Sequence, residues 1–225
     1  MTARWKDLCL DADDPAALGA FWAAVIGLEV DPDASPSTPG PVSLVGPTDR
    51  HRVWVNPTTT PRRVKHRLHL DVDAGSVAEV EALGARIVLP AEESGFGWTV
   101  MADPEGGEFC VFVRDEPPAY RLHGVVVDCR DPFAQAAWWG RVLGVEPVHH
   151  ADEGYATLEG AGPDDRLTLD FVPVPEAKVT PNRVHWDLVG DRDELVLLGA
   201  THRWDTPGWT VLADPEGNEF CVFAA

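Results

Sequence analysis

The 225-residue sequence is poor in basic side chains and in cysteine. Its 18 lysines and arginines stand against 37 aspartates and glutamates, which gives a formal net charge of −19. A surface this acidic repels phosphate backbones and anionic lipids, so nucleic acids and membranes are not expected as partners. The four cysteines form no CxxC pair and are expected to be reduced thiols rather than a disulfide framework: Cys9, Cys110, Cys129 and Cys221.

Long apolar runs and familiar catalytic motifs are also missing. No stretch approaches the roughly 18 to 20 apolar residues of a membrane span, and residues 1–10 lack the basic and apolar regions of a signal peptide. A cytoplasmic protein is therefore expected. The sequence has no Walker loop, no GxGxxG after a strand, no HExxH and no GxSxG elbow.

The chain does contain an internal duplication. GWTVMADPEGGEFCVF (97–112) returns as GWTVLADPEGNEFCVF (208–223), with 14 of the 16 positions identical. Three further landmarks recur in the same order: 11–30 with 128–147, 66–72 with 182–188, and 83–87 with 198–202. The repeat predicts two domains, residues 1–113 and 120–225, joined by an acidic, proline-containing linker at 114–119.

Local signals divide each half into two strand–helix–three-strand modules. The longer helix of each half has an aspartate N-cap, a proline at its first position and a glycine stop: Asp14 to Gly27, and Asp131 to Gly144. A shorter helix is predicted over 76–84 and again over 191–199. Asp-Pro-Glu-Gly has the residues of a type I turn, so each repeated stretch is predicted to be a β-hairpin.

Two matched strands place polar side chains on one face. Arg67, His69 and Asp71 alternate with apolar residues, and Arg183, His185 and Asp187 repeat the pattern. The apolar face is expected to pack on the helices, which leaves the polar face on the concave side. The last strand of each half likewise puts a glutamate and a cysteine on one face: Glu108 with Cys110, and Glu219 with Cys221.

These polar faces have two interpretations. They could surround a ligand, with His69 or His185 as a general base and an arginine holding an anionic group. They could instead form a salt-bridged network that keeps adjacent strands in register. In the same way, Cys110 and Cys221 could be metal ligands or small apolar fillers of a sheet face.

Nine tryptophans are many for this length. Two lie on the matched helices and two on the matched hairpins, and all four are expected in the core: Trp22, Trp139, Trp98 and Trp209. Among the remainder, Trp54 and Trp186 are candidates for lining an apolar pocket that takes a flat ligand.

The FW or WW helix, the HxD strand and the closing DPEGNE-type hairpin each occur twice. With them the chain resembles the vicinal oxygen chelate superfamily, which includes glyoxalase I, bleomycin-resistance proteins and extradiol dioxygenases, and in particular its glyoxalase-like branch. The resemblance implies an α+β fold of tandem domains in which paired βαβββ modules form a curved mixed sheet around a cavity. A tandem chain can complete such cavities within itself, as a monomer with internal pseudo-twofold symmetry or as a homodimer.

The resemblance also implies positions for a divalent metal such as zinc, nickel, manganese or iron. The first-strand ligand falls on Asp7 in one half and on Gly124, which has no side chain to donate, in the other. His123 is adjacent, but its side chain is expected on the opposite face unless the strand is bulged.

The remaining implied ligands lie in the later modules. The histidine of the HxD strand is His69 or His185, and cysteine replaces the glutamate of the last strand at Cys110 and Cys221. Asp170 is the candidate that ends the third module. The resulting sets are Asp7 with His69 and Cys110, and His185 with Cys221 and Asp170.

Several functions follow from these features. The first is a protein of the bleomycin-resistance type that binds a small organic ligand in an aromatic cavity, without the full metal site of the family. The alternative is a divalent-metal-dependent lyase, isomerase or dioxygenase acting on a carbonyl or catechol-type substrate. A third is a metal-free enzyme in which His69, Asp71, His185 and Asp187 carry out acid–base catalysis.

Overall fold

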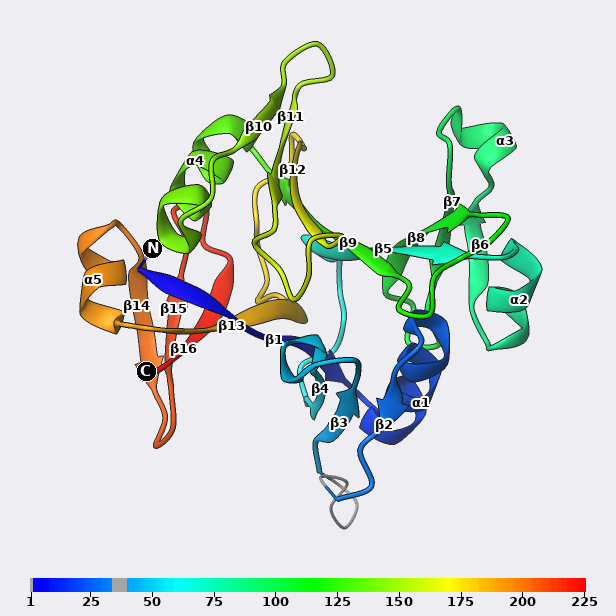
Figure 1. Ribbon diagram of the computed structural model, residues 1–225, viewed down its shortest axis with the longest axis horizontal. Coiled ribbons are helices and arrows are strands. Elements are labelled where there is room, and N and C mark those ends of the chain that lie inside the picture. The colour runs from blue at the N-terminus through cyan, green and yellow to red at the C-terminus, as the bar shows by residue number, and fades with distance from the viewer. Residues whose placement is uncertain (1, 34–39) are drawn as a thin grey trace.

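The computed structural model describes residues 2–33 and 40–225 (Figure 1). The first half contains β1 (Ala3–Ala12), α1 (Pro15–Ile26), β2 (Glu29–Val30), β3 (Val42–Val45), a 3-10 helix η1 (Asp49–His51), β4 (Val53–Pro57), β5 (Leu68–Ala74), α2 (Val77–Ala82), β6 (Arg86–Leu89), α3 (Ala91–Ser94), β7 (Thr99–Ala102) and β8 (Glu108–Val113). The second half contains β9 (Leu122–Cys129), α4 (Pro132–Leu143), β10 (Val148–His150), β11 (Tyr155–Glu159), β12 (Thr168–Pro173), β13 (Val184–Gly190), α5 (Arg192–Leu197), β14 (Thr201–Asp205), β15 (Thr210–Ala213) and β16 (Glu219–Phe223).

These elements form four modules of a strand, a helix and three strands, as predicted. They are module 1 (3–57), module 2 (68–113), module 3 (122–173) and module 4 (184–223). In the described part of the chain, no helix is long and apolar enough to cross a membrane.

The modules pair across the two halves of the chain. Sheet A joins module 4 to module 1 in the order β14-β15-β16-β13-β1-β4-β3-β2, and sheet B joins module 3 to module 2 in the order β10-β11-β12-β9-β5-β8-β7-β6. At the centre of each sheet the first strands of the two modules run antiparallel, β1 beside β13 and β5 beside β9 (Figure 1). The chain thus completes both sheets within itself, and each sheet contains strands from both sequence repeats.

All four predicted N-cap residues cap a helix in the structure. The Asp14 side chain accepts hydrogen bonds from the backbone N–H groups of Ala16 and Ala17, and α1 ends at Gly27 with φ of 74°, a conformation that glycine adopts without strain. α4 begins at Asp131 in the same way. The shorter helices α2 and α5 are capped by Ser76 and Asp191.

The two long helices link the sheets through aromatic contacts. The ring of Trp22 on α1 lies 5.0 Å from that of Phe109 on β8 of sheet B, between ring centroids. Trp139 on α4 lies 4.9 Å from Phe220 on β16 of sheet A. Both tryptophans are buried, which confirms their predicted place in the core.

The hairpin tryptophans were predicted to lie in the core, and this prediction is wrong. Trp98 is half-buried and Trp209 is 40% exposed. They stack on Phe112 and Phe223, with ring centroids 5.1 and 5.5 Å apart. Each phenylalanine follows a strand cysteine by two residues and so shares its face, which brings the tryptophans to the polar side of the sheet.

Each Asp-Pro-Glu-Gly turn binds the start of a long helix. The Glu105 carboxylate accepts hydrogen bonds from the backbone N–H groups of Asp13 (2.9 Å) and Asp14 (2.8 Å), just before α1. Glu216 does the same for residues 130–131, at 2.8 and 2.9 Å, before α4. Because β8 belongs to sheet B and β1 to sheet A, the Glu105 contact ties the two sheets together.

The turn aspartates organise the same junction from inside. Asp214 is buried and accepts hydrogen bonds from Gln135 Nε2 (2.7 Å), Trp139 Nε1 (3.2 Å) and Asn218 Nδ2 (2.9 Å). Burial raises the pKa of the Asp214 carboxyl above its ordinary value, and these donors partly oppose the rise.

We expect Glu105→Ala to lower the free energy of unfolding by about 1–3 kcal/mol. The backbone N–H groups of Asp13 and Asp14 and the Arg183 guanidinium would all lose a charged acceptor. Urea unfolding followed by circular dichroism measures this. Glu146→Ala, at an exposed position, is the control. Equal urea midpoints for the two variants would contradict a structural role for the turn glutamate.

Candidate functional site

Sheet A places four polar or thiol side chains together. β13 puts His185 and Asp187 on one face, because side chains alternate along a strand. Cys9 on β1 is the register partner of His185, and Cys221 on β16 is the register partner of Asp187. We call these four residues the sheet A cluster.

Atoms of the sheet A cluster approach one another closely. Cys9 Sγ lies 3.5 Å from Asp187 Oδ2, and His185 Nε2 lies 3.6 Å from Asp187 Oδ1. Cys221 Sγ lies 3.6 Å from His185 Nε2. Ligand atoms of Cys9, His185 and Asp187 all fall within 4.8 Å of one another, a spacing that could hold a metal ion.

Burial determines the protonation of this cluster. Burial raises the pKa of both thiols, Cys9 and Cys221, well above the ordinary value, and the neighbouring Asp187 carboxylate adds to the rise. Burial also raises the pKa of Asp187, with His185 partly opposing it. As an isolated set, the cluster holds its thiol protons at neutral pH.

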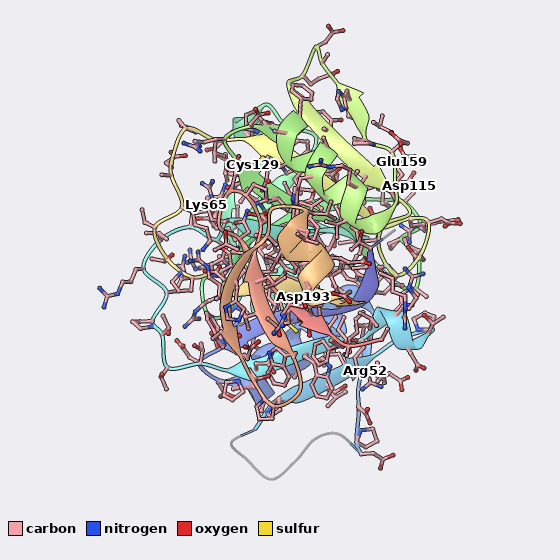
Figure 2. All side chains as sticks on the ribbon, turned by 90° about the vertical axis from the view of Figure 1, so that its left-hand side faces the viewer. Arg52, Lys65, Asp115, Cys129, Glu159 and Asp193 are labelled. Atoms are coloured by element: carbon pink, nitrogen blue, oxygen red, sulfur yellow. The ribbon has the colours of Figure 1, made fainter. Side chains whose placement is uncertain are left out.

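A cavity of about 620 Å³ opens above the sheet A cluster, and all four cluster residues line it. Its other lining residues include four aromatic side chains and several charged ones: Trp54, Trp204, Trp209, Phe223, Lys6, Asp11 and Glu219. Trp204 is 53% exposed and Trp209 is 40% exposed, so large apolar surfaces face solvent at the rim. In Figure 2 strands β14–β16 and helix α5, marked by Asp193, face the viewer.

Sheet B repeats part of this arrangement. His69 and Asp71 share a face of β5, and Cys110 on β8 is the register partner of Asp71. Their ligand atoms lie within 4.8 Å of one another. Burial lowers the pKa of His69 to about 4 and raises that of Asp71 to about 8, the latter helped by the Asp170 carboxylate.

Gly124 allows the two sheet B carboxylates to approach. A Cβ atom at this position would lie 3.2 Å from Asp71 Cβ and 3.3 Å from Asp170 Oδ2. Asp170 is held by the hydroxyls of Thr157 (2.7 Å) and Thr168 (2.8 Å). Where the family resemblance implies a first-strand ligand, sheet B therefore has glycine at position 124 with the carboxyl groups of Asp71 and Asp170 close around it.

Strand β1 in sheet A and strand β9 in sheet B each contain a bulge. The bulge in β9 changes the direction in which His123 points. The register of β5 on β9 shifts at His123, and the register of β1 on β13 shifts at Lys6. His123 was expected to face away from the cluster unless the strand was bulged. Its ring instead lies 4.8 Å from that of Phe112, and Lys6 Nζ lies 4.3 Å from the Phe223 ring. A bulge reorients a side chain in this way.

The two predicted metal sets are not assembled. Asp7 lies on sheet A, where its carboxylate is buried and bound to Lys6, whereas His69 and Cys110 lie on sheet B. Asp170 lies on sheet B beside Asp71, away from His185 and Cys221. The reason is that modules pair across the halves, so residues of one half are divided between two sheets.

Arg67 and Arg183 were predicted to bind a ligand, and both are hydrogen-bonded to distant segments of the chain. Arg183 is buried and donates to Asp13 Oδ1 (2.6 Å) and Glu105 Oε2 (3.2 Å). Arg67 donates to the backbone carbonyl of Glu176 (2.9 Å). These partners support the structural interpretation for both arginines.

The other predicted ligand-binding residues are divided between cavity and core. Trp54 and Glu219 line the sheet A cavity, with Glu219 ion-paired to Lys178 at 2.8 Å. Glu108 lines only a small cavity of about 20 Å³. Trp186 is 2% exposed and packs on Trp139, so its predicted place in a ligand pocket is wrong. It lies on the apolar face of β13, opposite His185 and Asp187.

Sequence reasoning missed several residues of this cavity. Cys9 and Asp11 follow Asp7 at alternate positions of β1, and that alternation was the available signal. Phe223 follows Cys221 at the alternate position of β16 and carried the same signal, whereas Trp204 offered none. Trp204 joins the cavity because the edge strand β14 lies with β15 and β16 beside β13 in sheet A.

Both halves of the chain match the family model of a glyoxalase-like domain, over residues 7–112 and 124–223. The chain therefore belongs to this family. Its fold is similar to that of glyoxalase I from Zea mays (16% identity, TM-score 0.67, covering 99% of this chain and 92% of that one). It is also similar to a putative dioxygenase from Bacillus subtilis (16% identity, TM-score 0.60, covering 99% and 85%). No curated protein matches the sequence significantly.

These matches confirm the resemblance to the vicinal oxygen chelate superfamily and the α+β fold of tandem glyoxalase-like domains. At this level of identity the solved structures establish the fold alone. The described residues include two groups able to hold a metal, and the matches leave the ion unspecified.

We expect Asp71→Asn to flatten the pH dependence of stability. The pKa of Asp71 is about 8 in the folded chain against an ordinary 3.8, so the unfolded chain loses this proton first as pH rises. Stability is therefore lost between about pH 4 and pH 8, by on the order of a few kcal/mol. Chemical unfolding at pH 4.5 and pH 8 measures the effect.

Asp115→Asn, at an exposed linker position, is the control for this prediction. It should keep the pH dependence of the unmodified protein. The same slope in Asp71→Asn would show that Asp71 ionises normally in the folded chain.

Proposed function

We propose that the protein binds a small organic ligand with a flat aromatic surface in the sheet A cavity, in the manner of a bleomycin-resistance protein. The cavity itself carries the proposal. Its volume of about 620 Å³ lies within the roughly 300–1,000 Å³ of small-molecule sites, and its aromatic wall combines Trp54, Trp204, Trp209 and Phe223. Aromatic side chains contribute most of the contact energy to a flat ligand.

The charges around the cavity favour a neutral or cationic ligand. Asp11, Asp187 and Glu219 line the cavity; Glu219 is paired with Lys178, and the one lining lysine, Lys6, is paired with Asp7, so the lining carboxyls without a lysine partner are Asp11 and Asp187. Cations are also attracted to the faces of tryptophan rings. An anionic ligand would meet acidic groups without a free cation among the lining residues that the structure describes.

The floor of the cavity supplies the polar contacts. Thiol groups at Cys9 and Cys221 offer weak donors, and the His185 imidazole and Asp187 carboxyl can donate or accept according to their protonation. A few polar groups beneath an apolar wall fix the orientation of a ligand. These four residues are expected to determine which functional group points inward.

The test is a thermal-shift and tryptophan-quenching panel of planar aromatic compounds, including cationic proflavine and anionic anilinonaphthalene sulfonate. We expect cationic or neutral members to raise the melting temperature. Trp209→Ala should weaken their binding about tenfold or more through loss of ring contact.

Trp98→Ala is the matched control, because Trp98 is the hairpin counterpart of Trp209 and does not line this cavity. It should leave binding unchanged. No shift with any compound, or an equal loss in both variants, would refute the proposal.

A second candidate is a divalent-metal-dependent lyase, isomerase or dioxygenase acting on a carbonyl or catechol-type substrate. The observation that favours it is the convergence of Cys9, His185 and Asp187 within 4.8 Å at the floor of a ligand-sized cavity. A bound ion would supply Lewis-acid polarisation of a substrate oxygen. The aromatic wall would orient the substrate, and Asp11 could take up a proton near that oxygen.

For this candidate, turnover of carbonyl or catechol substrates should require loading with zinc, nickel, manganese or ferrous iron. His185→Ala should abolish the turnover because it removes a ligand beneath the cavity. His69→Ala, its counterpart in sheet B, should retain it. Turnover that survives His185→Ala would exclude this site.

A further inference from the structure

A second hollow lies at the end of sheet A where β1 begins, β13 and β16 end, and β14 turns into β15. We call it the end groove; its volume is about 720 Å³, and its lining residues include Arg4, Val189, Asp193, Thr206 and Trp209. Asp193 is labelled in Figure 2. Thr206 and Trp209 line both the end groove and the sheet A cavity, so the two hollows adjoin. A ligand that stacks on Trp209 in the cavity can therefore extend past this ring into the groove.

The acidic side chains of the end groove already have partners. Asp191 accepts hydrogen bonds from the backbone N–H groups of residues 193 and 194, at 2.7 and 3.1 Å. Asp193 is paired with Arg192 at 2.9 Å, and Asp205 accepts a hydrogen bond of 2.7 Å from a threonine hydroxyl. Arg4, in contrast, is exposed, and its guanidinium has no ion pair or hydrogen bond with the residues that the structure describes. The uncommitted charge of the groove is therefore positive.

The sheet A cavity has uncommitted charge of the opposite sign. Asp11 and Asp187 line it without a lysine partner, and the free cation that it lacks lies next door, at Arg4. A guanidinium presents a planar fork of N–H donors that matches the two oxygens of a carboxylate. Two adjoining hollows with opposite uncommitted charges fit a ligand that has a cationic part and an anionic part.

We infer that the ligand of the sheet A cavity carries a flexible tail ending in a carboxylate, which lies in the end groove against Arg4. The inference rests on the proposed function, because the flat head of the ligand must occupy the cavity. Strand register gives the length of the tail. Arg4 pairs with Val189, which lies two residues beyond Asp187 on β13. At a rise of about 3.3 Å per residue, the groove position lies about 7 Å along the strand from the cavity floor.

The experiment compares three acridines that share one flat head. They are 9-aminoacridine, which has no tail, N-(9-acridinyl)-6-aminohexanoic acid, and the primary amide of that acid. Titration of the full chain followed by acridine fluorescence measures their affinities. We expect the acid to bind about threefold to tenfold more tightly than its amide, because only the acid can form the charged contact with Arg4. High salt should reduce this difference by screening.

Arg4→Gln should bind the acid and the amide with equal affinity, because the guanidinium is lost while a side chain of similar length is kept. Arg86→Gln is the matched control, since Arg86 is also exposed on a strand but belongs to sheet B and does not line the groove. It should keep the preference for the acid. Circular dichroism verifies that both variants are folded.

The outcomes separate this inference from the proposed function. If 9-aminoacridine binds but the acid and the amide bind the unmodified chain equally, the inference is wrong and the proposed function stands. The inference is also wrong if folded Arg4→Gln keeps the preference for the acid, or if Arg86→Gln loses it. If none of the three acridines binds, the inference fails together with the proposed function on which it rests.

Discussion

The carboxylate of Glu105, which accepts two backbone N–H groups at the start of α1, ties together two modules that strand pairing does not join. Strand pairing joins module 1 to module 4 and module 2 to module 3, and nothing in the sheets joins modules within a half. The turn glutamates, with the Trp22–Phe109 and Trp139–Phe220 contacts, supply those missing links. The four modules are thereby closed into a ring. A duplicated chain needs the hairpin twice because the ring contains two such links.

The same scaffold carries two faces that have diverged through a few side chains. Trp54 is the register partner of Cys9 in sheet A, and Asp170 is the register partner of Val126 in sheet B. An aromatic wall beside a thiol leaves an open cavity with apolar surface, whereas an aspartate beside valine brings a second carboxylate toward Asp71. Desolvation and like-charge repulsion then keep Asp71 protonated near neutral pH. The two faces therefore offer different chemistry, and sheet A alone combines the thiol pair with a ligand-sized cavity among the cavities described above.

Much of the fold could be predicted from the sequence because its signals are local. Helix caps at Asp14 and Asp131 and the turn residues of the repeated hairpin act through hydrogen bonds a few residues away. Strand alternation also assigned His185 and Asp187 to the polar face. The core prediction for Trp209 rested on its matched position in the two hairpins and is wrong, because Trp209 precedes β15 and stacks on Phe223 at the polar face of the sheet. Alternation put His123 on the opposite face unless its strand was bulged, and the strand is bulged there; such a bulge changes the face of a residue without any mark in the local sequence.

By itself, the sequence determined the duplicated βαβββ modules, their capped helices and, away from the bulges at Lys6 and His123, the face on which the polar strand residues lie. The reason is that helix and strand periodicity and turn chemistry depend on neighbours in the chain. Only the tertiary structure decided which strands are adjacent. It separated Asp7 from His69 and Cys110, and it brought Cys9 to His185 across 176 positions of the sequence. A site is made by side chains on neighbouring strands, and the pairing of distant strands is set by how four amphipathic modules bury their apolar faces together.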